Sequence, residues 1–292
     1  MNLLSSNTSS QRRSDFFLTW IFKSLAFITG LISVLILVFI FIESVPALKH
    51  AGILSFFNSA AWYPKEDLFN LTPMLTGSVL AAFGGILLSA PLGILIALFC
   101  NYYAPKPVAW GYFRLLELLS GIPSVVFGFW GLVILVPWIT EIHPPGASLL
   151  AGILILTIMI LPTMALAADS IFKSFPAQQL QAASALGMSR TGIILRLILP
   201  LTSRQLFSAL ILQTGRALGE TMALLMVAGN VVQNPNSIFD PIRTLTANMA
   251  LEMAYATGNH RSALFVSGLF LMVLVIVLME IAQFFERGIR AN

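Results

Sequence analysis

Six long apolar stretches constrain the fold of this chain more than any other feature. Each exceeds the roughly 20 residues that a helix needs to cross the hydrocarbon core of a bilayer. Hydrophobic residues make up 58% of the chain and charged residues 10%, whereas soluble domains average about 25% charged. The sequence therefore predicts an all-α polytopic membrane protein with six transmembrane helices. The predicted spans are 16–42, 73–100, 115–139, 147–168, 205–232 and 263–285.

The sixteen lysines and arginines are divided unevenly between the two sides of these spans. With both termini in the cytoplasm, four fall outside (Lys49, Lys65, Arg243 and Arg261), Arg216 falls within a span, and the remainder fall inside. Cytoplasmic loops of membrane proteins carry an excess of basic residues, so the distribution predicts an N-in, C-in topology. The net charge of +4 is explained by this orientation, and no nucleic-acid partner is expected.

The chain is expected to form one membrane domain, residues 16–292, after a disordered cytoplasmic tail. Residues 1–15 are rich in Ser, Asn and Gln, a composition that does not bury enough apolar surface to fold. The first span exceeds a signal-peptide core and lacks a small-residue cleavage site, so we expect it to be retained. Trp62 and Tyr63, in the first outer loop, are predicted interfacial anchors.

An opposite-charge pair, Arg216 and Glu220, lies near the middle of the fifth predicted span. Hydrocarbon penalises each such charge by roughly 2.5–3.5 kcal/mol on insertion scales, so the pair is a functional hypothesis. The spacing of four predicts one helix face and mutual reach. Gly215 and Gly219 would admit a close neighbouring helix. Two interpretations stay open: a substrate path, or a structural salt bridge that pins this helix to its neighbours.

The third predicted span is interrupted by Gly121-Ile122-Pro123-Ser124. Membrane bundles tolerate such breaks because neighbouring helices and waters satisfy the freed backbone groups. The break would expose backbone amides to a solute, which makes Ser124 a candidate path residue, or it is a plain kink.

Two further short helices are predicted in loops. In the inner loop, Pro176 stands at a helix start and Gly187 at a left-handed helix end, which gives about eleven residues (176–187), near 16 Å long at 1.5 Å per residue. Its small side chains suit either a partner's groove or the membrane surface. In the outer loop 230–261, residues 244–253 form a mostly apolar helix that docks on the bundle or on a partner, as a gate or as a docking surface.

The sequence lacks the usual catalytic and metal-binding motifs. No Gly-Lys dipeptide is present, so no phosphate-binding P-loop exists and this chain does not itself hydrolyse ATP in that manner. His-Glu-x-x-His, Gly-x-Ser-x-Gly and Cys/His clusters are also absent. The lone Cys100 is interpreted as packing, and His50, His143 and His260 as surface residues. We therefore expect no catalytic residue, metal or cofactor on this chain, and a transporter driven from elsewhere.

The inner loop resembles the permease signature of importers of the ATP-binding-cassette superfamily. That signature is Glu-Ala-Ala, a Gly after three further residues, and, nine residues on, an apolar residue, any residue, Leu and Pro. All spacings are kept, and Gln181 replaces the usual Glu, which removes a charge. The matching residues are Gln181-Ala182-Ala183, Gly187 and Leu197-Ile198-Leu199-Pro200.

Other segments are similar to the phosphate-importer permeases, more to the PstC type than to its PstA-type partner. The likeness covers roughly residues 20–288. It is carried by residues 103–105, 116–128, 215–223, 244–248 and 250–252, with Gly-Arg-Ala-Leu-Gly-Glu-Thr-Met-Ala at 215–223.

This resemblance implies a type I importer fold in the bacterial inner membrane and an assembly of several chains. The implied partners are a sister permease of the PstA type, two copies of a cytoplasmic ATPase of the PstB type that holds ATP and Mg, and an external phosphate-binding protein of the PstS type. Arg216 and Glu220 are placed on the translocation path. Gln181, Ala182, Ala183 and Gly187 are placed on a coupling helix that contacts the ATPase.

Alternatives to a phosphate importer remain. The same machine would carry sulfate, phosphonate or molybdate, because an arginine does not discriminate among oxyanions. A stand-alone secondary transporter is less favoured, because no inverted pair of similar halves is evident. A membrane enzyme is the least favoured interpretation, because the sequence shows no catalytic constellation. Pairing with a sister chain or with a second copy stays open.

Overall fold

The computed structural model describes the backbone of residues 7–290 and the side chains of residues 16, 18–281, 283 and 284. Among the described residues, six helical segments are long and apolar enough to cross a membrane. The predicted number of spans is therefore confirmed, although the third and fifth differ in their bounds. The six segments are Leu18–Ala51, Thr72–Tyr102, Ser124–Ile142, Leu149–Lys173, Arg190–Leu218 and Gly258–Ile281.

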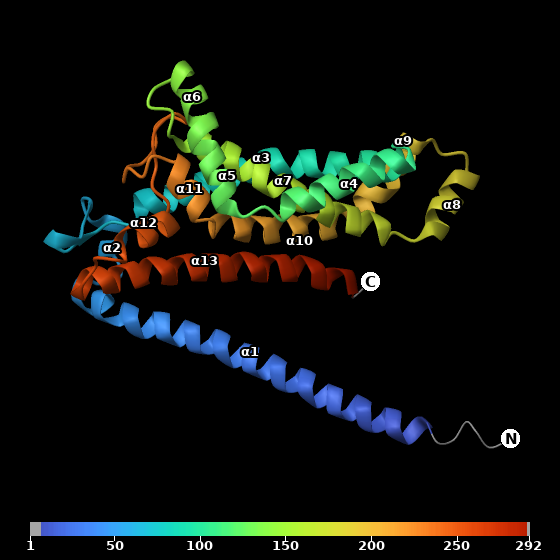
Figure 1. The fold of residues 1–292 in the computed structure, drawn as a ribbon, viewed down its shortest axis with the longest axis horizontal. Helices are drawn as coiled ribbons and strands as arrows, with labels where there is room; N and C mark the ends of the chain where they lie inside the picture. Colours follow the sequence, from blue (N-terminus) through green and yellow to red (C-terminus); the bar gives the residue numbers. More distant parts are fainter. Residues whose placement is uncertain (1–6, 291–292) are drawn as a thin grey trace.

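Most of the spans run side by side, whereas the third, Ser124–Ile142, stands at a steep angle to them, and the short elements lie toward the two ends of the bundle (Figure 1). The start of α1 (Asn7–Ala51) and the end of α13 (Gly258–Arg290) lie at the end that carries α8 (Ala177–Ala185). The opposite end carries α6 (Val136–Ile142) and α12 (Leu245–Glu252). This arrangement agrees with the predicted N-in, C-in topology, and we call these the inner and outer ends.

Helix α1 packs only its outer part against the bundle. Ala47 is buried in an outer cluster, whereas most of the described side chains nearer the inner end are exposed. The helix diverges from α13 toward the inner end (Figure 1). Because α1 begins at Asn7, residues 7–15, which the sequence predicts as part of a disordered tail, are helical here. Residues 1–6 lie outside the described residues.

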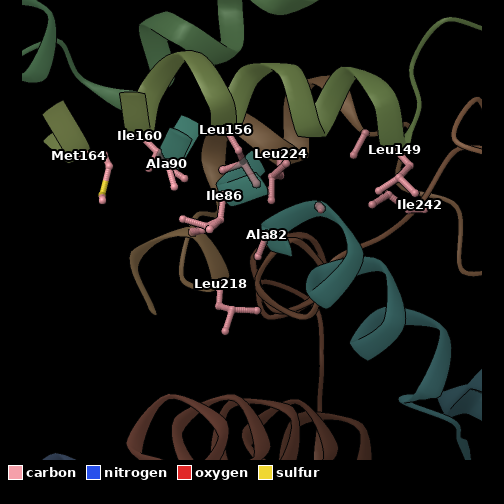
Figure 2. Packing of buried hydrophobic residues seen from close by; sticks show 13 residues of the cluster. Ala82, Ile86, Ala90, Leu149, Leu156, Ile160, Met164, Leu218, Leu224 and Ile242 are labelled. Atoms are coloured by element: carbon pink, nitrogen blue, oxygen red, sulfur yellow. The ribbon is translucent and has the colours of Figure 1, made fainter. Parts of the chain in front are cut away.

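The centre of the bundle is the contact between α3 (Thr72–Tyr102) and α7 (Leu149–Lys173). Small residues let the two helices approach: a Cβ added at Gly85 would lie 2.8 Å from the Cβ of Leu156, and one at Gly93 would lie 3.0 Å from the backbone nitrogen of Ala165. Figure 2 shows the apolar side chains that fill the space around this contact. Small residues at helix crossings are typical of membrane bundles.

The predicted third span falls on two separate helical segments, of which only the second, Ser124–Ile142, is long and apolar enough to cross a membrane. Helix α4 (Lys106–Ser120) ends before the break, and α5 (Ser124–Trp130) begins after it, continuing through the π-helical turn η2 (Gly131–Leu135) into α6. The break predicted at Gly121-Ile122-Pro123-Ser124 is therefore present, whereas the predicted start of the span at residue 115 is wrong, because the spanning segment begins at Ser124. Pro123 lacks an N–H and disfavours the helical conformation at the residue before it, which ends α4.

The fifth span begins earlier and ends earlier than predicted. It comprises α9 (Arg190–Ile193), the π-helical turn η3 (Ile194–Ile198) and α10 (Leu199–Leu218). Helix α11 (Met222–Val227) then follows as a separate element. The predicted span 205–232 is wrong in its second half, because the helix stops at Gly219, and glycine is a poor former of helix interiors.

The inner and outer short helices form as predicted. Pro176 precedes α8, and Gly187 has φ +75°, the left-handed conformation expected for a helix-ending glycine. Thr244 caps α12 by accepting the backbone N–H of Ala247 at 3.2 Å. Because most residues of α12 are buried and the helix contacts α3, α11 and α13, it docks on the bundle of its own chain.

A small outer layer covers the bundle between α1 and α3. It consists of α2 (Ser55–Asn58) and the antiparallel strands β1 (Trp62–Tyr63) and β2 (Leu68–Phe69), joined by the 3₁₀ turn η1 (Pro64–Glu66). Trp62 is 6% exposed, so its prediction as an interfacial anchor is wrong.

Candidate functional site

Arg216 lies near the middle of the bundle, in the last turn of α10. One turn earlier, Gln213 accepts a hydrogen bond from the hydroxyl of Thr163 at 2.9 Å, and Thr163 is close to the midpoint of α7. Leu218 belongs to the central cluster, with Leu156 of α7. The hydrogen bond and the shared cluster place the intervening arginine at mid-membrane depth.

Glu220 does not share a helix with Arg216. It follows the break at Gly219, and its Oε1 accepts the backbone N–H of Ala223 at 3.2 Å, in the first turn of α11. Its backbone carbonyl accepts a hydrogen bond from the hydroxyl of Thr246 at 2.9 Å. The prediction of one shared helix face is therefore wrong, since the carboxylate serves as a cap for the next helix.

The Arg216 guanidinium is exposed and forms no ion pair with any side chain that the structure describes. The C-terminal end of a helix stabilises a cation by about 0.3–1 kcal/mol, less than the roughly 2.5–3.5 kcal/mol that hydrocarbon costs. This arginine therefore needs water, an anion or another chain beside it.

The two glycines of this segment have different roles. A Cβ added at Gly215 would lie 2.8 Å from the terminal methyl of Met279 in α13, so Gly215 does permit a close neighbouring helix. A Cβ at Gly219 would meet only backbone oxygens of its own helix. Gly219 thus ends α10 and does not receive a neighbour.

Ser124 begins α5, which packs against α11 directly after Glu220. A Cβ added at Gly128, one turn further on, would lie 2.8 Å from the Cα of Ala223. No hydrogen bond joins Ser124 to Arg216 or Glu220 within the part of the chain that the structure describes. The broken third span and the broken fifth span nevertheless meet at this contact.

The predicted coupling residues gather on α8 at the inner end of the bundle. Ala183 is 6% exposed and packs in a cluster with Ile193 and Ile194, whereas Gln181, Ala182 and Gly187 are exposed. Leu186, between the helix and its glycine cap, is 83% exposed. From the sequence, Leu186 was predicted only as part of the helix. An isolated apolar side chain among small residues nevertheless indicates a docking contact.

A buried charge network at the outer end has no counterpart among the predicted site residues. The Glu252 carboxylate accepts hydrogen bonds from Arg243 Nη1 at 2.8 Å, from Trp62 Nε1 at 3.0 Å and from His260 Nε2 at 2.8 Å. It joins α12 to β1 and to the first turn of α13. The prediction of His260 as a surface residue is wrong, because its side chain is 17% exposed, whereas His50 and His143 are exposed as predicted.

No group of three His, Cys, Asp or Glu side chains comes together as metal ligands among the described residues. Cys100 is buried, in keeping with a packing role.

The chain has six spans, and the breaks before α5 and after α10 lie near a guanidinium at mid-membrane depth. A short helix is exposed at the inner end. These features are typical of a polytopic membrane component of a transport system. Residues 89–291 match the family of binding-protein-dependent transport system inner membrane components. The chain belongs to this family, and it is accordingly a multi-pass inner-membrane protein.

Curated relatives align over most of the chain. The phosphate transport system permease protein PstC of Mesorhizobium japonicum is 32% identical over 87% of this chain and 84% of its own length. The probable ABC transporter permease protein YqgH of Bacillus subtilis is 35% identical over 83% and 81%. Among solved structures, a chain of a bacterial alginate ABC transporter has a TM-score of 0.67 at 16% identity, covering 94% of this chain and 97% of that chain. This likeness shows that the fold is that of ABC importer permeases.

Proposed function

We propose that this chain is the permease subunit of an ATP-driven importer of inorganic phosphate. The observation that carries the proposal is the exposed Arg216 guanidinium in the middle of the bundle, without a carboxylate partner among the described side chains. A guanidinium presents a planar fork of N–H donors that matches the oxygens of phosphate. The relatives named as phosphate permeases, which cover most of the chain, favour this anion.

Within this proposal, Arg216 contacts the anion as it crosses, and Glu220 shapes the break beside it. Glu220 fixes the start of α11 through Ala223, so it leaves the guanidinium available. The hydroxyl of Ser124, on the helix that packs against α11, supplies a neutral donor on the neighbouring wall of the path.

The chain itself carries no ATP site in this account. A sister permease of the PstA type completes the path, and two ATPase subunits of the PstB type bind ATP and Mg and receive α8. Gln181, Ala182, Ala183 and Gly187 form the surface that meets the ATPase, and the exposed side chain of Leu186 inserts into it. A PstS-type binding protein delivers phosphate at the outer end.

Import of another oxyanion, such as sulfate, phosphonate or molybdate, is the second candidate. It uses the same guanidinium, and the names of the curated relatives weigh against it. A stand-alone secondary transporter has no use for the exposed helix α8.

The test is phosphate uptake by the assembled complex carrying Arg216→Gln. We expect uptake to fall by at least about tenfold, since loss of one charged hydrogen bond is worth about 1.5–3 kcal/mol. Arg204→Gln, which removes the same charge from the inner end of the same helix, is the matched control and retains uptake. Equal amounts of assembled complex are verified for both variants, and normal uptake by Arg216→Gln rejects the proposed role.

A further inference from the structure

A groove of about 560 Å³ opens between α7, α10 and α13 in the inner half of the bundle. Among the side chains that the structure describes, its lining is mostly apolar, with hydroxyl and amide groups from all three helices, and none of these lining residues is charged. The polar members are Ser170 and Ser174 on α7, Gln205 and Ser208 on α10, and Gln283 on α13.

This groove lies on the same face of α10 as Arg216. Gln205, Leu212 and Arg216 are all exposed, and at about 100° per residue their side chains fall within about 40° of one another around the helix. The first two line the groove. Arg216 stands above it, about 16 Å from Gln205 along the axis at 1.5 Å per residue.

A largely apolar lining with a few neutral donors suits an anion that must leave. Hydroxyl and amide groups donate hydrogen bonds to an oxyanion, yet hold it less strongly than a charged donor, whose hydrogen bonds are roughly twice as strong. A carboxylate in the groove would repel the anion, and a second cation would retain it. The described side chains of the lining carry neither sign of charge, which fits passage of the anion rather than its retention.

We infer that this groove is the inner half of the translocation path, a neutral exit vestibule that receives phosphate from Arg216 and releases it to the cytoplasm. The inference rests on the proposed function and adds to it the residues of the exit: Ser170, Gln205 and Ser208 line the route, and Leu212 separates it from the guanidinium.

Cysteine modification tests the exit directly, because the only native cysteine, Cys100, is buried. Ser170→Cys places a thiol in the groove. Ser203→Cys is the matched control, since Ser203 is also exposed near the inner end of α10 and is not part of the lining. Each variant, on a Cys100→Ala background, is reconstituted as the full complex in proteoliposomes loaded with binding protein and phosphate. In transporters whose cytoplasmic side faces the external solution, added ATP then drives phosphate from the vesicle interior to the outside.

Two methanethiosulfonate reagents of similar size, one with a sulfonate and one with a trimethylammonium group, are added from the inner face. At Ser170→Cys we expect the sulfonate to slow phosphate transport at least about fivefold more than the ammonium, because a like charge a few ångströms from the anion repels it. At Ser203→Cys neither reagent changes transport by more than about twofold, as befits a solvent-screened charge.

Equal inhibition by both reagents at Ser170→Cys, complete labelling without inhibition, or the same charge preference at Ser203→Cys overturns the inference. Gln205→Cys provides a second groove position with the same expectation if Ser170→Cys does not assemble. Failure of the proposed function is distinguishable, because the unmodified variants then transport no phosphate in response to ATP.

Discussion

At the scale of single residues, Arg216 differs from a structural arginine in having no carboxylate neighbour among the described side chains. A salt bridge that pins one helix to another requires a partner at hydrogen-bond distance, as Arg243 has in Glu252 at 2.8 Å. Glu220 instead accepts a backbone N–H from the next helix. The structural interpretation of the pair therefore lacks its central contact.

A double-mutant cycle measures this difference. Arg216→Gln and Glu220→Gln, separately and together, are expected to change the stability of the assembled complex additively, within about 0.3–0.5 kcal/mol, as residues without a shared contact do. The cycle of Arg243→Gln with Glu252→Gln is the positive control, and contact between those two side chains predicts a coupling energy of about 0.5–3 kcal/mol. Thermal unfolding of each variant complex measures the stability changes from which both coupling energies are calculated. A coupling energy for Arg216 and Glu220 as large as that of the control contradicts the account.

Residue types and spacing were sufficient to locate Arg216 and Glu220, because charges are rare in apolar runs. Their geometry was not predictable in the same way. The i, i+4 rule assumes an uninterrupted helix, and the sequence does not reveal that Gly219 ends α10 and that Glu220 caps α11. Glu252 was missed for a different reason: Trp62, one of its partners, lies 190 residues away in the chain.

At the scale of elements, the contact between α3 and α7 depends on positions where a side chain is missing. Gly85 faces the Cβ of Leu156 across this contact. Such close approach matters in a membrane because van der Waals packing, and not burial from water, drives helix association.

Substitution of one glycine tests this packing. Gly85→Ala is expected to cost about 1–3 kcal/mol of stability, as overpacking does. Gly111→Ala is the matched control: a Cβ at this position in α4 meets no atom within 4 Å, and alanine gains about 1 kcal/mol over glycine in a helix interior. The measurement is the midpoint temperature of thermal unfolding of the two purified variants. Equal midpoints would show that the α3–α7 contact tolerates a larger residue.

The outer network gives a second prediction for an element, the docking of α12. Glu252→Ala leaves Arg243 without its carboxylate in a place where the two side chains are 20% and 9% exposed. Breaking a buried pair costs about 3–5 kcal/mol, so α12 should become accessible to protease well before the spans unfold. Asp67→Asn, which removes a pair with His50 whose side chains are 52% and 51% exposed, should cost less than about 1 kcal/mol. Equal protection of α12 in both variants would contradict the role assigned to Glu252.

Elements with local end signals were predictable. Pro176 and Gly187 bound α8, and Thr244 begins α12, because a fixed φ, a left-handed φ and a side-chain cap each act within a few residues. The break in the third predicted span was evident from Gly121-Ile122-Pro123-Ser124, whereas hydropathy did not resolve the break in the fifth, since α11 after it is apolar throughout. The length of an apolar run predicts how many residues lie in the lipid, but it does not predict where the helix axis changes direction.

At the scale of the whole molecule, the inner end of the bundle presents α8 with Leu186 beside Gly187. Under the proposed function a separate ATPase docks on this surface, which must then hold its shape when the ATPase moves. Gly187 has φ +75° and no neighbouring atom within 4 Å of an added Cβ, so a substitution there acts through backbone strain and not through a clash inside the chain.

Gly187→Val therefore separates coupling from folding. A β-branched residue in the left-handed region costs about 1–3 kcal/mol, and we expect membrane insertion to persist while phosphate-stimulated ATP hydrolysis is no longer accompanied by transport. Gly187→Asn, which tolerates this conformation, is expected to retain coupling. The ratio of phosphate transported to ATP hydrolysed is the measurement, and an unchanged ratio in Gly187→Val argues against α8 as the coupling element.

The orientation of the molecule followed from the lysine and arginine distribution, and the order of its spans from length and hydropathy. In the proposed assembly a second permease chain completes the path, so the sequence of this chain defines the surroundings of Arg216 on one side only.

A structure of the assembled transporter with its outer end closed over phosphate tests whether the Arg216 guanidinium contacts the anion in transit. The account predicts two N–H groups of Arg216 at about 2.7–2.9 Å from phosphate oxygens, with Glu220 still bound to the backbone of α11. An Arg216 paired with a carboxylate, of this chain or of its partner, and sealed from any cavity that holds phosphate would contradict it.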